Sequence, residues 1–163
     1  MKTKTLFTTL FLCFFSVFAF AQESKKVSDL FDKLSESNEV QSVVITKALL
    51  QLMPESAAGI KGIDMGNLVK KIDHFGIYET GDVKAIEIMR SIAKEIEKDK
   101  SFEVLMKIKE NDEQSSFFAE KGKDGIVKSF IMFMNESKET TIIRILGNFT
   151  SEDMKYILEN INM

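Results

Sequence analysis

The stretch FEVLMKIKENDEQSSFFAEKGKDGIVKSFIMFMN, residues 102–135, decides the fold. In its first part, residues 102–109, apolar side chains alternate with charged ones, and this period of two is typical of a half-buried β-strand. Asn111-Asp112 marks a turn, and residues 114–120 return as a second strand. The pattern therefore predicts an antiparallel hairpin.

An apolar run at residues 126–134 follows a glycine-containing turn at residues 122–125. Both faces of this run are apolar, as in a central strand that is covered on both sides. Periodicity alone leaves a buried helix open for such a run. Residues 135–139 predict a polar turn, and the β-branched residues 140–146 predict a further strand.

The part of the chain before the hairpin mixes helices and strands. Residues 27–36 and 82–99 carry apolar side chains at helical spacing, which predicts two amphipathic helices. Residues 40–45 are β-branched and residues 72–80 alternate, so we expect a strand at each. Helix formers at residues 46–53 precede a proline, which predicts a short helix directly after the first strand.

Two segments are defined by their turn and cap residues. Residues 54–66 hold the only proline and three of the eight glycines, so we expect a long loop, followed by one helical turn at residues 68–71. Thr150 is a favourable N-cap residue, and the two acidic residues that follow it place negative charge at the start of a helix. We expect this amphipathic helix over residues 150–161.

The predicted elements define the fold class. Consecutive strands imply antiparallel hairpins rather than βαβ units. The expectation is a single α+β domain, with one antiparallel sheet of about five to six strands and helices packed on a face.

The first 21 residues have the order of a secretory signal peptide. Lys2 and Lys4 form a positive head, residues 6–18 form an apolar core, and Ala19-Phe20-Ala21 is a small-x-small cleavage site. The core is shorter than the roughly 20 residues that a spanning helix needs. We therefore expect export and cleavage after Ala21, with no stable membrane anchor left afterwards.

Lipid attachment through Cys13 is the other alternative for this leader. A lipoprotein site has a small residue before the cysteine, whereas Leu12 stands here, so we interpret Cys13 as part of the apolar core. Cleavage leaves residues 22–163, a single domain of 142 residues without cysteine. Its formal charge is −5 instead of −3, because the leader carries two lysines and no acidic residue.

Charge and motifs exclude several function classes. Nucleic acids and anionic lipids bind to strongly basic surfaces, and the composition of this mildly acidic chain does not indicate one. We therefore expect no nucleic acid partner. The sequence contains neither Gly-x-Gly-x-x-Gly nor a Walker motif, so nothing supports nucleotide binding.

His74 is the only histidine, and it follows Asp73 in a predicted strand. Neighbouring strand residues point to opposite faces, so this pair is not a catalytic couple, and we interpret His74 as a structural residue. Glu110, Asp112 and Glu113 gather at a hairpin turn without the spacing of a calcium loop, which indicates a solvated turn. We assign no catalytic, cofactor-binding or metal-binding residue and expect no cofactor.

The run Met132-Phe133-Met134 has two interpretations. Methionine-rich apolar surfaces can adapt to partners, but apolar residues in a central strand more often form the core. We expect core and keep a partner-binding face as the alternative.

Three segments resemble a known family. They are Leu30-Phe31-Asp32-Lys33, Val43-Val44-Ile45-Thr46-Lys47-Ala48-Leu49-Leu50, and Gly147-Asn148-Phe149-Thr150-Ser151-Glu152-Asp153. These segments resemble the bacterial family called domain of unknown function 4252, and the resemblance covers residues 27–160. It implies a small exported protein without an assigned activity and supplies no functional residues.

These observations lead to a hypothesis with two rivals. The hypothesis is an exported protein, periplasmic or extracellular, that binds a protein partner of the cell envelope without catalysis. The first rival is a hydrolase whose acidic residues meet only in the folded chain, and a pocket lined by two or more carboxylates would favour it. The second is a structural envelope component.

Overall fold

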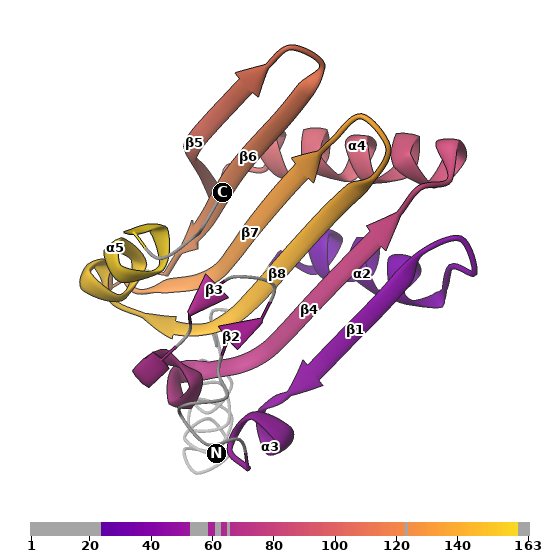
Figure 1. The fold of residues 1–163 in the computed structure, drawn as a ribbon. Coiled ribbons are helices and arrows are strands. Elements are labelled where there is room, and N and C mark those ends of the chain that lie inside the picture. Colours follow the sequence, from indigo (N-terminus) through magenta and orange to yellow (C-terminus); the bar gives the residue numbers. More distant parts are fainter. Residues whose placement is uncertain (1–23, 53–58, 61–62, 65, 123, 160–163) are drawn as a thin grey trace, which may run out of the picture.

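The computed structural model describes residues 24–52, 59–60, 63–64, 66–122 and 124–159, and it contains a six-stranded antiparallel sheet (Figure 1). The strands are β1 (Gln41–Thr46), β4 (Ile72–Thr80), β5 (Phe102–Glu110), β6 (Glu113–Lys121), β7 (Val127–Asn135) and β8 (Thr140–Phe149). Their spatial order is β1-β4-β8-β7-β6-β5, and every neighbouring pair is antiparallel. The predicted α+β fold with one antiparallel sheet is confirmed.

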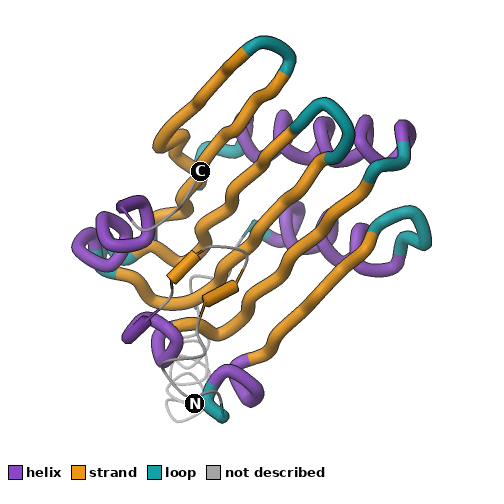
Figure 2. The backbone as a smooth tube through the Cα atoms, in the orientation of Figure 1, coloured by secondary structure: helices purple, strands orange, loops and turns teal. Residues whose placement is uncertain are grey.

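The helices lie on both sides of this sheet. They are α2 (Lys25–Glu36), α3 (Lys47–Leu50), the 3-10 helix η3 (Gly66–Lys71), α4 (Val83–Lys98) and α5 (Ser151–Glu159). The two long helices, α2 and α4, lie on the far face of the sheet in Figures 1 and 2. None of the described helices has the length and apolar character needed to cross a bilayer.

One half of the core lies between the sheet and the two long helices. Buried side chains from α2 and α4 pack against buried side chains of the strands, and they include Phe31, Leu34, Met89, Ile96, Tyr78, Phe118, Ile131 and Ile142. The rings of Phe31 and Tyr78 lie 5.2 Å apart between centroids.

The other half of the core covers the opposite face. Here the three short helices bury the sheet, through Leu50 of α3, Leu68 and Val69 of η3, and Met154 and Ile157 of α5. The sheet contributes Phe75, Phe117, Phe130, Met132, Ile143 and Ile145. Both faces of the central strands are therefore apolar and covered, whereas the edge strands β1 and β5 are mostly exposed.

The apolar run at residues 126–134 is a strand and not a helix. β7 lies between β8 and β6, and its side chains alternate between the two halves of the core. Phe130 and Met132 point to one half, and Ile131 and Phe133 point to the other. A doubly covered central strand explains why both faces of this run are apolar.

The strand expected to end at residue 146 continues as β8 through Gly147 to Phe149. Gly147 pairs with Ile72 of β4, and a Cβ atom at this position would lie 2.3 Å from the main-chain oxygen of Lys71. Only glycine fits this close approach of two backbones. The glycine therefore marks a contact rather than the end of the strand.

The segment expected as a loop is only partly described. Residues 53–58, 61–62 and 65 lie outside the described residues, as do the leader and residues 160–163. Within the rest, β2 (Gly59–Ile60) pairs with β3 (Ile63–Asp64), and η3 spans six residues instead of the one turn predicted.

Two side-chain caps fix helices where the sequence predicted helix starts. Asp82 Oδ1 accepts hydrogen bonds of 2.9 Å from the main-chain N–H groups of Lys84 and Ala85 at the start of α4. At α5, the Thr150 N–H donates to Asp153 at 2.8 Å, and the Asp153 N–H donates to the Thr150 hydroxyl at 3.2 Å. Reciprocal bonds of this kind are a capping box.

Candidate functional site

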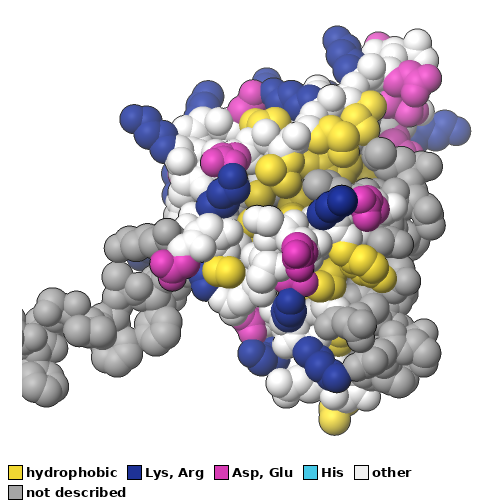
Figure 3. All heavy atoms as spheres, turned by 90° about the vertical axis from the view of Figure 1, so that its left-hand side faces the viewer, with side chains coloured by type: hydrophobic (Ala, Val, Ile, Leu, Met, Phe, Trp, Pro, Cys, Tyr) yellow, Lys and Arg dark blue, Asp and Glu magenta, His cyan; other side chains and the backbone are white. Residues whose placement is uncertain are grey.

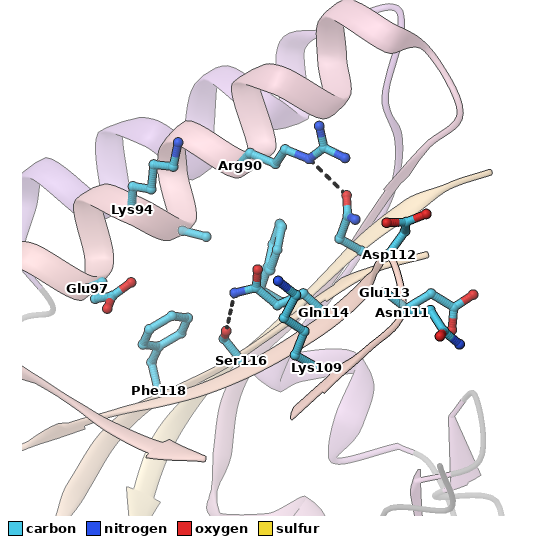
Figure 4. Close-up of a pocket in the computed structure, with 13 residues that line it drawn as sticks. Arg90, Lys94, Glu97, Lys109, Asn111, Asp112, Glu113, Gln114, Ser116 and Phe118 are labelled. Carbon is cyan, nitrogen blue, oxygen red and sulfur yellow. Dashed lines mark hydrogen bonds between the residues drawn. The ribbon is translucent and has the colours of Figure 1, made fainter. Parts of the chain in front are cut away.

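A polar cavity lies between α4 and the β5–β6 hairpin, and we call it the α4–hairpin pocket (Figure 4). Its volume is about 370 Å³, which is in the range of small ligand sites. Its lining is formed by Arg90, Ala93, Lys94 and Glu97 of α4, by Lys109, Asn111, Asp112, Glu113, Gln114, Ser116 and Phe118 of the hairpin, and by Phe133 and Asn135 of β7.

Local sequence places both walls of this pocket. On α4, Arg90, Lys94 and Glu97 are spaced by four and three residues, so they share one exposed side of the helix. The hairpin turns at Asn111, whose φ of 53° lies in the left-handed region that asparagine tolerates. This turn carries Asp112 at its tip.

The floor of the pocket holds buried polar groups. Asn135 Oδ1 accepts a hydrogen bond of 3.0 Å from Arg90 Nε and another of 3.0 Å from the Thr140 hydroxyl. Arg90 also donates to Glu87 at 2.6 Å, so its guanidinium is held in one orientation. Gln114 donates to the buried Ser116 hydroxyl at 3.3 Å.

The rim of the pocket carries both signs of charge. Three of its side chains are cationic and three are carboxylates, and Glu97 forms an ion pair with Lys107 of β5. Asp112 and Glu113 are exposed at the hairpin turn. A mixed rim of this kind matches a ligand with both charges, such as a polypeptide segment.

Three carboxylates in one pocket meet the condition that would favour the hydrolase rival. However, a general acid at neutral pH needs a carboxyl group in apolar surroundings. Asp112 and Glu113 lie in solvent, and the side chain of Glu97 is 44% exposed beside the ammonium of Lys107. The pocket therefore brings three carboxylates together, and all three are open to solvent.

His74 lies away from this pocket, on β4, opposite Thr46 of β1 and Leu146 of β8. It is half-buried, and within the described part of the chain its Nε2 atom has no hydrogen-bond partner. Burial lowers the pKa of His74, the positive charge of Arg144 lowers this pKa further, and Asp32 opposes both effects. His74 is not among the residues that line the α4–hairpin pocket.

Asp73 does not join His74. Its carboxylate is exposed and forms an ion pair of 2.6 Å with Lys47. Glu110, Asp112 and Glu113 are exposed at their turn, and the described residues contain no cluster of three or more candidate metal ligands.

The run Met132-Phe133-Met134 belongs to the core. Met132 and Phe133 are 1% and 4% exposed, and Met134 packs partly buried against the same core. The Phe133 ring reaches the floor of the α4–hairpin pocket, so this run contributes one residue to a candidate site.

A second opening is apolar and was not predicted from the sequence. It has a volume of about 620 Å³ and lies between α5 and the β5–β6 hairpin. Figure 3 views this side of the molecule and shows hydrophobic side chains at the surface. The groove is lined by Leu105, Met106, Ala119, Val127 and Met154, with Lys121, Ser151, Lys155 and Glu159 around them. A smaller apolar gap of about 190 Å³ separates α2 from α4.

A buried polar group lies beneath α2. Arg144 of β8 is 4% exposed, and its guanidinium carbon lies 4.6 Å from the centre of the Phe31 ring. Arg144 also donates a hydrogen bond of 3.5 Å to the Ser28 hydroxyl. A cation over an aromatic face is stabilising, so this contact fixes α2 on the sheet.

The family follows from the sequence together with this fold. The family model described as Domain of unknown function (DUF4252) matches residues 31–157. The match covers most of the chain, and the chain belongs to this family. No curated protein and no solved structure matches the chain.

Proposed function

We propose that this protein is exported to the cell envelope, where it binds a partner protein without catalysing a reaction. Export is supported by the leader pattern of residues 1–21, with its positive head, apolar core and cleavage site. The mature chain would begin at Gln22.

One observation carries the binding function, namely the construction of the α4–hairpin pocket. Its floor is buried and hydrogen-bonded, with Asn135 7% exposed, whereas its rim is charged and open to solvent. The guanidinium of Arg90 is held by Asn135 and Glu87 and needs little reordering when it meets a carboxylate. The ordered guanidinium of Arg90 can bind a carboxylate, and the exposed acidic turn can bind a cationic group. Together they match a polypeptide segment that carries both charges.

Lys94 provides the sharpest test because the same helix supplies a matched control. Lys94 lines the pocket, whereas Lys98 lies one turn further along α4, outside the pocket, with a side chain 73% exposed. Tagged wild-type protein, Lys94→Glu and Lys98→Glu are each used to capture partners from envelope extract. We expect Lys94→Glu to reduce capture of the main partner at least about tenfold.

The control decides how the result is interpreted. Lys98→Glu changes the net charge by the same amount and should leave capture unchanged. Equal losses in both variants, or no specific partner with the wild type, would contradict the proposed site.

The hydrolase rival predicts a chemical change in the captured partner. The partner is incubated with the purified protein and analysed by mass spectrometry. Fragments that form with the wild type and disappear with Asp112→Asn plus Glu113→Gln would favour hydrolysis, and an intact partner would favour binding alone.

Export is tested separately from binding. The protein is expressed from its full-length gene, the cells are fractionated, and the N-terminus is sequenced. We expect Gln22 as the first residue in the envelope fraction, and an uncut chain in the cytoplasm would contradict export.

A further inference from the structure

The strand β1 forms an open edge of the sheet. It pairs with β4 on one side, and no strand of the described chain lies on its other side (Figure 1). An edge strand presents unpaired N–H and C=O groups that can pair with another strand. The edge of β1 is therefore able to accept a further strand.

The side chains of β1 do nothing to prevent such pairing. The strand reads Gln-Ser-Val-Val-Ile-Thr and contains no charged residue, proline or glycine. Val43 and Val44 point to opposite faces and are 54% and 43% exposed. All six residues pair with β4 without a register shift, so the outer edge is also regular.

We propose that a second copy of this chain pairs antiparallel with β1 across a two-fold axis. The axis stands perpendicular to the sheet, so each face of one sheet continues into the same face of the other. The two six-stranded sheets then form one continuous sheet. This is an isologous contact, the commonest kind in homodimers.

Charges at the two ends of β1 identify both the partner and the register. A two-fold axis through Val43 pairs residues whose numbers add to 86. Val43 then faces its own copy. Glu39, in the turn two residues before β1, comes to the side of Lys47 of the second copy, the first residue of α3, and the same pair is repeated at the other end. The Lys47 ammonium bonds to Asp73, but its side chain is 53% exposed and can also receive the Glu39 carboxylate. Opposite charges that lie side by side across such a contact are favourable.

The two neighbouring registers lack this match. An axis through Val44 would place Glu39 opposite Leu49 and Lys47 opposite Gln41. An axis through Ser42 would place Glu39 opposite Ile45 and Lys47 opposite Ser37, so neither charge meets its opposite in either case. The residues of β1 are uncharged in all three registers. The charge pattern therefore selects a second copy in the Val43-centred register.

The arrangement has a consequence for the α4–hairpin pocket. The pocket is lined by the β5–β6 hairpin. This hairpin lies at the edge of the sheet opposite to β1 (Figure 1). A dimer through β1 would leave both pockets open at its two far ends, and two linked sites bind a multivalent partner more tightly than one. The dimer itself does not depend on the proposed function.

The absence of cysteine from the mature chain gives a direct experiment. Val43→Cys is made in a Cys13→Ser background, so it is the sole thiol whether or not the leader is cleaved. Directly opposite residues have Cβ atoms about 4.5–5.5 Å apart, within reach of a disulfide after small adjustments or of a short bifunctional thiol reagent. The control is Val104→Cys, a valine of the other edge strand that is 42% exposed.

We expect covalent dimer from Val43→Cys in both oxidising and reagent-treated samples, at least about tenfold more than from Val104→Cys. The full-length gene product purified from cells should also sediment as a concentration-dependent dimer. Equal cross-linking of both variants, or a monomer at all concentrations, would overturn the proposal.

Charge reversal tests the register and the symmetry together. Glu39→Lys alone should weaken self-association about tenfold, because it creates two like-charge contacts. Lys47→Glu alone creates the same two contacts and also breaks the ion pair with Asp73, so its unfolding by urea is measured as well. A mixture of these two single variants should associate again, because each charge then meets its opposite in the other chain. If the mixture associates no better than the single variants, the Val43-centred register is wrong.

Discussion

The two edges of the sheet, β1 and β5, are built in opposite ways. Four of the nine residues of β5 are charged, and the strand has a bulge between Val104 and Met106, whereas β1 is uncharged and regular. Both edges expose apolar residues, since Val104 and Leu105 are 42% and 37% exposed. Charges and bulges are the devices that protect an edge from pairing, so exposure alone does not decide which edge associates.

The largest expected effect comes from making β1 resemble β5. Val43→Lys would place two ammonium groups beside each other at the two-fold axis and remove an apolar contact. We expect the dimer dissociation constant to rise by at least about 100-fold in sedimentation experiments. The free energy of unfolding of the monomer should change by less than about 0.5 kcal/mol, because Val43 is 54% exposed. Val104→Lys is the control, and the same loss of association there would remove the distinction between the edges.

At the β5 end of the sheet, buried polar bonds should affect folding rather than association. Asn135→Ala removes the acceptor shared by Arg90 and the fully buried Thr140 hydroxyl. The expected cost is about 1–3 kcal/mol of unfolding free energy, measured by urea denaturation with self-association unchanged. Gln114→Ala is the control, since Gln114 is exposed and should cost less than about 0.5 kcal/mol. Equal costs for the two variants would contradict a buried polar floor.

A smaller effect is expected when the protection of β5 is removed. Lys107→Gln plus Lys109→Gln leaves this edge with glutamines such as the one that β1 carries at position 41. We expect light scattering on gentle heating to grow roughly threefold faster, because lysines on an edge oppose strand pairing. Lys94→Gln plus Lys98→Gln on α4 changes the net charge equally and should scatter like the wild type. If aggregation is accelerated equally in both double variants, the change in net charge and not the position of the lysines would explain it.

The strands could be predicted from the sequence because their pattern is local. The period of two at residues 102–109 and the doubly apolar run at residues 126–134 both became strands, with bounds shifted by about one residue. The strand predicted over residues 140–146 stops three residues before the end of β8 at Phe149, because a glycine does not by itself predict a strand. The actual role of Gly147 is set by the main chain of Lys71, which is distant in sequence.

The α4–hairpin pocket could not be predicted for the same reason. The Arg90–Asn135 bond joins residues 45 positions apart, and no motif or spacing in the sequence connects them. The acidic turn and the amphipathic helix were each predicted, but only the order of the strands in the sheet brings them together. The edge position of β1 also depends on that order, because the sequence of this segment predicts a strand but not its place in the sheet.

The smallest expected effect is a response to pH at the β1 end only. His74, the single histidine, pairs with Thr46 of β1, and burial together with Arg144 lowers its pKa despite the opposing charge of Asp32. The unfolded chain, with a histidine pKa near 6.5, then binds more protons than the folded chain below that value. Stability is therefore fully present above about pH 6.5 and falls as the pH decreases toward the lowered pKa of the folded state.

Hydrogen exchange locates this response along the sheet. After correction for the intrinsic rates, exchange in β1 and β4 should increase between about pH 6.5 and 5, while β5 and β6 should change less. His74→Gln should remove the pH dependence, and the accompanying shift of the urea midpoint should be smaller than that of Asn135→Ala. An equal response at both edges, or one that persists in His74→Gln, would assign it to carboxylates distributed over the whole sheet. If the response is confined to β1 and β4, the stability of the edge proposed to pair with a second copy also depends on pH.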